Sequence, residues 1–143
     1  MKYMLLIYAD ENAWTPEERE KCYAESIALT HDLKARGQYV TASPLQSVTT
    51  ATSLRIREGK RLVTDGPFAE TKELVAGFWL WKCASLAEAI DWAKRCPAPM
   101  GPGQESELEI RQVFENEDFG AEFTPELRAQ EDRLRAELAA KTV

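Results

Sequence analysis

The stretch "KYMLLIYA", residues 2–9, is a continuous apolar run of strand length. A run without polar alternation is typical of a strand that faces water on neither side. It therefore predicts a central strand, buried on both faces of a sheet or placed at a subunit interface.

The segment after this strand carries the signals of a helix start. In "TPEE", residues 15–18, Thr15 can cap the helix, Pro16 takes the first helical position and Glu18 completes a capping box. The helix is expected to run to residue 36, because Gly37 supplies a left-handed stop. Its apolar or small side chains predict one face at a 3.6-residue period, formed by Cys22, Tyr23, Ser26, Ile27, Leu29, Thr30 and Leu33.

The remaining elements follow from alternation and turn residues. A second helix is predicted from the Ser85 cap to Pro97, with Leu86, Ala89, Ile90 and Ala93 buried. Further strands are predicted for "GQYVTAS" (37–43), for the hairpin "TSLRIREGKRLVT" (52–64), for "LVAGFWLWKC" (74–83) and for "ELEIRQVFE" (107–115). Within 74–83, Gly77 predicts a bulge or a close backbone approach.

This order, strand, helix, strand, hairpin, strand, helix, strand, predicts an α+β fold of the ferredoxin-like split βαβ type. An extra helix is expected over residues 124–141, again opened by Thr-Pro. Its large apolar side chains, Leu127, Leu134 and Leu138, form a stripe so narrow that we expect it to cover a groove or a neighbouring subunit.

Composition limits the class of protein. The 143 residues suit one domain, and 44% apolar with 29% charged residues is typical of a globular chain. The longest apolar run falls far short of the roughly 20 residues of a membrane-spanning helix. Scattered positive charges within a net charge of −6 argue against direct nucleic-acid binding.

Three cysteines, Cys22, Cys83 and Cys96, have no metal-ligand or disulfide spacing. We expect a cytoplasmic protein without a metal site. No phosphate loop, nucleotide fingerprint, zinc-protease helix or Ser/His/Asp order is present, so no cofactor is expected.

The segment "TDGPFAETKE", residues 64–73, carries the candidate chemistry. Asp65 suits a turn, but on a loop held by a scaffold its carboxylate can also serve a site. Turn geometry requires neither Glu70 nor Lys72. If they are partly buried, each would change the other's ionisation and act as a proton carrier; the alternative is a solvated ion pair.

Other candidate residues are open to a simpler interpretation. Phe68 and Trp79 could line an aromatic ligand pocket, or Trp79 could belong to the core or a dimer interface. Arg55 shares a strand face with Arg57 and could hold an anion, although a solvated strand face explains both. The single histidine, His31, is expected on the polar face of the first helix.

The segment "DGPFAETKE" resembles, letter for letter, the signature of the DGPF family within the YCII-related proteins. "KYMLLIY", "WAKRCP" and "VFENEDFG" extend the resemblance over residues 1–120. It implies a ferredoxin-like subunit over 1–120 that pairs sheet to sheet into a dimeric α+β barrel, with a pocket near the interface. Residues 121–143 form an extension outside it.

The sequence departs from the family pattern at two places. Some YCII-related enzymes use a histidine in the first helix, and here Ser26 stands at about that position, which makes Ser26 a substrate-binding candidate and removes a histidine mechanism. Where the family usually has Gly-Gly after the signature, this chain has Ala76-Gly77.

Two classes of function remain open. One is a cofactor-independent enzyme with proton-transfer chemistry of the isomerase, lyase or dehalogenase kind, with Asp65, Glu70 and Lys72 as catalytic residues and Phe68, Ser26, Trp79 and Arg55 binding a small organic acid or phenol. The other is a non-catalytic ligand-sensing or interaction module beside a regulator of the extracytoplasmic-function sigma factor type, a partner that the resemblance suggests.

Overall fold

The computed structural model describes residues 1–10, 14–65, 74–99 and 105–141, apart from the side chain of Asp65. The chain forms two compact units, Met1–Gln112 and Val113–Val143. We describe each unit by itself.

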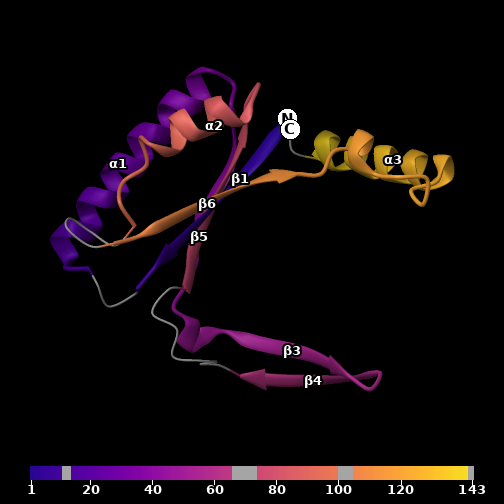
Figure 1. Ribbon diagram of the computed structural model, residues 1–143, viewed down its shortest axis with the longest axis horizontal. Coiled ribbons are helices and arrows are strands. Elements are labelled where there is room, and N and C mark those ends of the chain that lie inside the picture. Colours follow the sequence, from indigo (N-terminus) through magenta and orange to yellow (C-terminus); the bar gives the residue numbers. More distant parts are fainter. Residues whose placement is uncertain (11–13, 66–73, 100–104, 142–143) are drawn as a thin grey trace. The chain divides into compact units, whose positions relative to one another are not determined.

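The first unit is built on a four-stranded sheet with the order β2-β5-β1-β6 (Figure 1). Strands β1 and β2 both pair antiparallel with β5, so they run parallel to each other on either side of it. The helix α1 connects them, which is the split βαβ arrangement. The predicted ferredoxin-like α+β order is confirmed, and the bounds are β1 Lys2–Ala9, β2 Tyr39–Pro44, β5 Leu74–Lys82, β6 Glu107–Val113 and α1 Pro16–Ala35.

Both helix starts form as the sequence predicts. Thr15 accepts the backbone N–H of Glu18 at 3.2 Å, and the Glu18 carboxylate accepts the N–H of Thr15 at 2.9 Å. The helix α1 ends before Gly37, whose φ of 68° is left-handed. Helix α2, Leu86–Ala93, begins after the Ser85 cap but ends four residues before the predicted Pro97. After Ala93 the hydrogen bonding changes to the 3-10 type, because the N–H of Arg95 donates to the carbonyl of Trp92, three residues before it.

The core lies between the sheet and the two helices, which cover the same face of it (Figure 1). Helix α1 contributes fewer buried side chains to this core than the sequence predicts. Leu29 and Leu33 of α1 are buried, whereas Tyr23 and Ile27 are 54% and 60% exposed. Only the C-terminal half of this long helix therefore packs deeply on the sheet. The sheet contributes the buried side chains of Tyr3, Leu5, Trp79 and Trp81.

Helix α2 also buries a different set from the one predicted. Leu86 and Ile90 are 50% and 38% exposed, and Trp92 is buried with Ala89. Polar bonding fixes Trp92, because its indole Nε1 donates to Gln38 Oε1 at 3.0 Å. The Gln38 amide in turn donates to Glu88 at 2.8 Å. This chain of bonds ties the segment after α1 to α2.

A two-stranded sheet of β3, Thr52–Arg57, and β4, Lys60–Asp65, forms the predicted hairpin. Its two-residue turn places Glu58 and Gly59 at φ values of 51° and 74°. Positive φ at both positions is the type I′ pattern that suits the twist of a hairpin.

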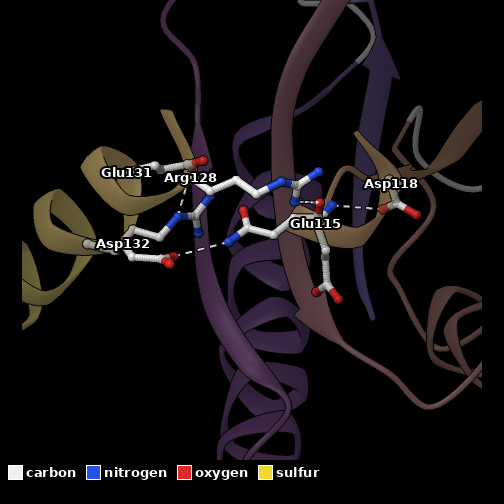
Figure 2. A network of polar contacts seen from close by, with 7 residues as sticks. Glu115, Asp118, Arg128, Glu131 and Asp132 are labelled. Atoms are coloured by element: carbon white, nitrogen blue, oxygen red, sulfur yellow. Dashed lines mark hydrogen bonds and ion pairs between the residues drawn. The ribbon is translucent and has the colours of Figure 1, made fainter. Parts of the chain in front are cut away.

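The second unit contains a short 3-10 turn, Asn116–Asp118, and helix α3, Pro125–Lys141. Arg128 of α3 donates to the backbone carbonyls of Asn116, Phe119 and Phe123, the last two at 3.1 Å. Figure 2 shows this arginine near Glu115 and Asp118, where the N–H of Glu115 donates to Asp118 at 2.8 Å. One guanidinium therefore orders the loop that precedes its own helix.

The stripe predicted on α3 is present but exposed. Leu127, Leu134 and Leu138 are 44%, 55% and 57% exposed. What covers them stays a prediction. In the part of the chain that the structure describes, no helix combines the length and apolar character needed to cross a bilayer.

Candidate functional site

The face of the four-stranded sheet that α1 and α2 leave uncovered is rich in apolar side chains. Register places Met4 opposite Leu80 and Leu6 opposite Phe78 on the two central strands. Because side chains alternate along a strand, these four share the face opposite Tyr3, Leu5, Trp79 and Trp81. Each of the four is only partly buried within the described residues. This apolar floor is the first component of the candidate site.

A polar pair lies at one end of this floor. The pairing of β1 with β5 shifts its register between Ile7 and Tyr8. The phenolic hydroxyl of Tyr8 donates a hydrogen bond to Glu109 Oε2, with 3.1 Å between the two oxygens. Glu109 belongs to β6, where its neighbours Leu108 and Ile110 pack on the core, so Glu109 projects to the uncovered face. Strands at the two ends of the sequence therefore bring a phenol and a carboxylate together.

The pair has a defined electrostatic setting. The hydrogen bond to Glu109 raises the pKa of the Tyr8 phenol above 10.0, and partial burial and the negative charge of Glu109 raise it further. The other Glu109 oxygen, Oε1, lies 3.6 Å from Arg111 Nε, and the Glu109 side chain is 38% exposed. Tyr8 thus stays protonated at neutral pH and can donate, whereas Glu109 can accept.

Strand β5, which follows the sequence-predicted segment in the chain, begins beside this pair. Tyr8 pairs with Val75 and Ala9 pairs with Leu74, the first residue after the segment 66–73. Phe68, Glu70 and Lys72 lie in that segment, outside the described residues. Asp65 is the last residue of β4, opposite Thr52. The chain therefore leaves the signature segment and enters β5 at the Tyr8 end of the sheet.

The other predicted site residues stand on three different elements. Trp79 is 5% exposed in the core, where its ring centroid lies 5.8 Å from that of Trp81. Ser26 is partly buried on α1, and its carbonyl accepts the Thr30 hydroxyl at 2.8 Å. Arg55 is exposed on β3. His31 is exposed on α1, as predicted.

Two surface hollows lie away from the sheet floor. One, of about 130 Å³, is lined by Trp14, Glu18, Lys21, Cys22, Glu25, Pro97 and Ala98. Burial raises the pKa of Cys22 above its ordinary value, and it raises that of Cys96 to about 12. Both thiols therefore stay protonated at neutral pH, and a protonated thiol is a poor nucleophile. The second hollow belongs to the hairpin and contains Arg55, Arg57, Leu62 and Thr64.

Sequence reasoning did not single out Tyr8 or Glu109. The alternation of Met4, Leu6 and Tyr8 along one strand was visible in the sequence, as was the alternation of Leu108, Glu109 and Ile110 along another. Pairing the two required the strand order, which places the last strand of the sheet beside the first.

Comparison with known proteins agrees with this architecture. The YCII-related domain matches residues 1–116. A relative from Rhizobium meliloti (strain 1021), described only as an uncharacterized protein, is 41% identical over 97 residues, which cover 66% of this chain and 78% of the relative. A domain match over most of the chain, on a sheet with the split βαβ strand order, shows that this chain belongs to the YCII-related domain family.

Proposed function

We propose that the uncovered sheet face is a small-molecule site and that Tyr8 and Glu109 carry out cofactor-independent proton transfer there. The observation that carries this proposal is the 3.1 Å bond from the Tyr8 phenol to the Glu109 carboxylate at the end of an apolar floor. A donor and an acceptor side by side are the minimum set for general acid–base chemistry.

The chemistry follows from the two groups. The Glu109 carboxylate removes a proton from an acidic C–H of the substrate, and the electron pair moves to the adjacent carbonyl oxygen. The Tyr8 hydroxyl turns from Glu109 to that oxygen and stabilises its negative charge by donating a hydrogen bond. In a β,γ-unsaturated carbonyl compound the resulting dienolate takes the proton back at its γ-carbon, the C=C bond moves into conjugation with the carbonyl, and an isomerisation is complete. Small unsaturated oxo acids with a ring or short apolar chain suit the floor of Met4, Leu6, Phe78 and Leu80, and phenols resemble the enol form of such compounds.

The proposal includes a homodimer. A sheet with both helices on one face has an apolar second face to cover, and a second copy that pairs sheet to sheet would enclose a pocket there. The DGPF signature, residues 65–73, supports membership of that branch of the family, and we propose that Asp65, Glu70 and Lys72 lie at the rim of the pocket. A cytoplasmic location suits the free thiols of Cys22, Cys83 and Cys96.

A ligand screen with matched variants tests the function. Wild-type protein is screened by thermal shift against small organic acids and phenols, and each stabilising ligand is then assayed for turnover. We expect Glu109→Gln and Tyr8→Phe to fold and bind while turnover falls by about a hundredfold, the lower end for a general acid or base. Glu70→Gln and Lys72→Met are assayed in parallel.

The alternative function gives a different result in the same assays. A non-catalytic sensing module would bind ligands and show no turnover in any variant. Ligand binding without turnover would therefore reject the enzyme and favour the module. Turnover that survives both Tyr8→Phe and Glu109→Gln would reject this pair as the catalytic groups.

A further inference from the structure

The hairpin of β3 and β4 exposes an unusual amount of apolar surface. Leu54, Ile56 and Val63 are 54%, 67% and 65% exposed. Leu54 lies directly opposite Val63, and Ile56 follows Leu54 by two residues, so the three share one face. A hairpin of two strands alone is marginally stable in water. This face therefore needs a covering surface.

The hairpin also differs in charge from the rest of the chain. Over residues 52–65 it carries four basic residues, Arg55, Arg57, Lys60 and Arg61, against the two acids Glu58 and Asp65. The whole chain has 24 acidic and 18 basic residues, so the part outside the hairpin is more acidic than the net charge of −6 indicates. A basic, apolar hairpin and an acidic protein surface are complementary.

The second face of the hairpin fits the same partner. Arg55 pairs with Leu62, and together with Arg57 and Thr64 they line a hollow of about 310 Å³. Two guanidinium groups at one hollow suit a carboxylate side chain, which Arg binds in a forked geometry. An acidic partner that encloses both faces of the hairpin offers that carboxylate on this face and apolar area for Leu54, Ile56 and Val63 on the other.

We infer that the β3–β4 hairpin is an arm that binds the acidic body of a second copy of this chain. A second copy is the occupant because its charge is opposite to that of the hairpin and because it carries exposed apolar side chains of its own, such as Tyr23 and Ile27 on the acidic helix α1. The inference does not depend on the proton-transfer chemistry at Tyr8 and Glu109. It adds a contact that the sheet-to-sheet pairing does not include.

Photo-crosslinking tests the contact directly. A photoreactive phenylalanine analogue replaces Ile56, and this chain, labelled with ¹⁵N, is mixed with an unlabelled copy before irradiation. We expect crosslinked peptides that join labelled to unlabelled chains and that diminish at high salt, because exposed charges are screened. Crosslinks confined within one chain, the absence of any crosslink, or crosslinks only to lipid or nucleic acid added as competing polyanions would overturn the inference.

Sedimentation gives the second measurement. The double variant Ile56→Thr, Val63→Thr keeps β-branched side chains but removes apolar area, and we expect self-association at least about tenfold weaker. Ser53→Thr, on the opposite face, is the control and should associate as wild type does. Unchanged association of the double variant would overturn the arm while leaving sheet-to-sheet pairing intact. If the double variant fails to fold, the crosslinking result decides.

Discussion

A Cβ atom at Gly77 would lie 2.9 Å from the carbonyl oxygen of Ser43 and 3.2 Å from the Cα of Pro44. Both neighbours are backbone atoms of β2, which pairs with β5 at this point. Only a residue without a side chain lets the two strands approach so closely. Gly77 therefore fixes the pairing of the edge strand β2 with β5.

Gly77→Ala should destabilise the protein by about 1–3 kcal/mol, the usual cost of forcing atoms into a packed interior. Neither backbone neighbour can move without breaking the β2–β5 pairing. Chemical denaturation measures this loss. Ala76→Gly, at the adjacent position, is the control for the altered sequence, and equal stability of Gly77→Ala and wild type would show that β2 moves freely.

The stability of the β3–β4 hairpin should depend on the residue at the first turn position, Glu58. Glu58 has a φ of 51°, in the left-handed region of the backbone, and this conformation costs most L-residues free energy. Asn adopts the same conformation at a lower cost. Glu58→Asn is expected to stabilise the hairpin by up to about 1 kcal/mol, seen as slower amide exchange in β3 and β4. Gly59→Ala should speed that exchange for a purely backbone reason, because an added Cβ there meets nothing within 4 Å. The same exchange rates in all three proteins would contradict this account of the turn.

Acid stability should depend on Glu88. The N–H of Ala84 and then the Gln38 amide donate to its carboxylate, and these bonds lower its pKa below the ordinary value of 4.5. A lowered folded-state pKa stabilises the protein above pH 4.5, and this contribution is lost as the pH falls through the folded-state value. Glu88→Gln should therefore melt lower than wild type at neutral pH, and the difference should shrink below pH 4.5. Glu25→Gln controls for the loss of one negative charge, and a difference that stays constant with pH would contradict the role of Glu88.

The loop before α3 should depend on the shape of the Arg128 side chain. Its guanidinium reaches three backbone carbonyls and lies 5.1 Å from the centre of the Phe123 ring. Lysine keeps the charge but cannot reach three acceptors at once. We expect Arg128→Lys to weaken the second unit by about 1–3 kcal/mol. Faster amide exchange over residues 116–123 would report it, whereas Arg133→Lys on the same helix should have no such effect.

Local signals in the sequence predicted most of the first unit. The Thr15 capping box, the stop at Gly37 and the close approach at Gly77 all formed as predicted, because each depends on a few neighbouring residues. Contacts between distant segments were harder to predict. The buried Trp92 depends on Gln38, which is 54 positions away, and helical periodicity alone favoured Leu86 and Ile90 instead.

The candidate site shows the same division. The signature segment could be recognised from its residues alone. Tyr8 and Glu109 are separated by 101 positions and come into contact because the last strand of the sheet lies beside the first. No local pattern marks such a pair. Its polar bond depends on the position of β6 beside β1 in the sheet.

The most direct test of the central claim is solvent deuterium exchange at the acidic C–H of a ligand that the thermal-shift screen identifies, followed by NMR in D₂O. If Glu109 removes that proton, wild-type protein accelerates the exchange, Glu109→Gln binds the ligand but loses about a hundredfold of the acceleration, and Tyr8→Phe retains part of it. Exchange that Glu109→Gln accelerates as well as wild type does, with equal ligand binding, would contradict proton transfer at this site.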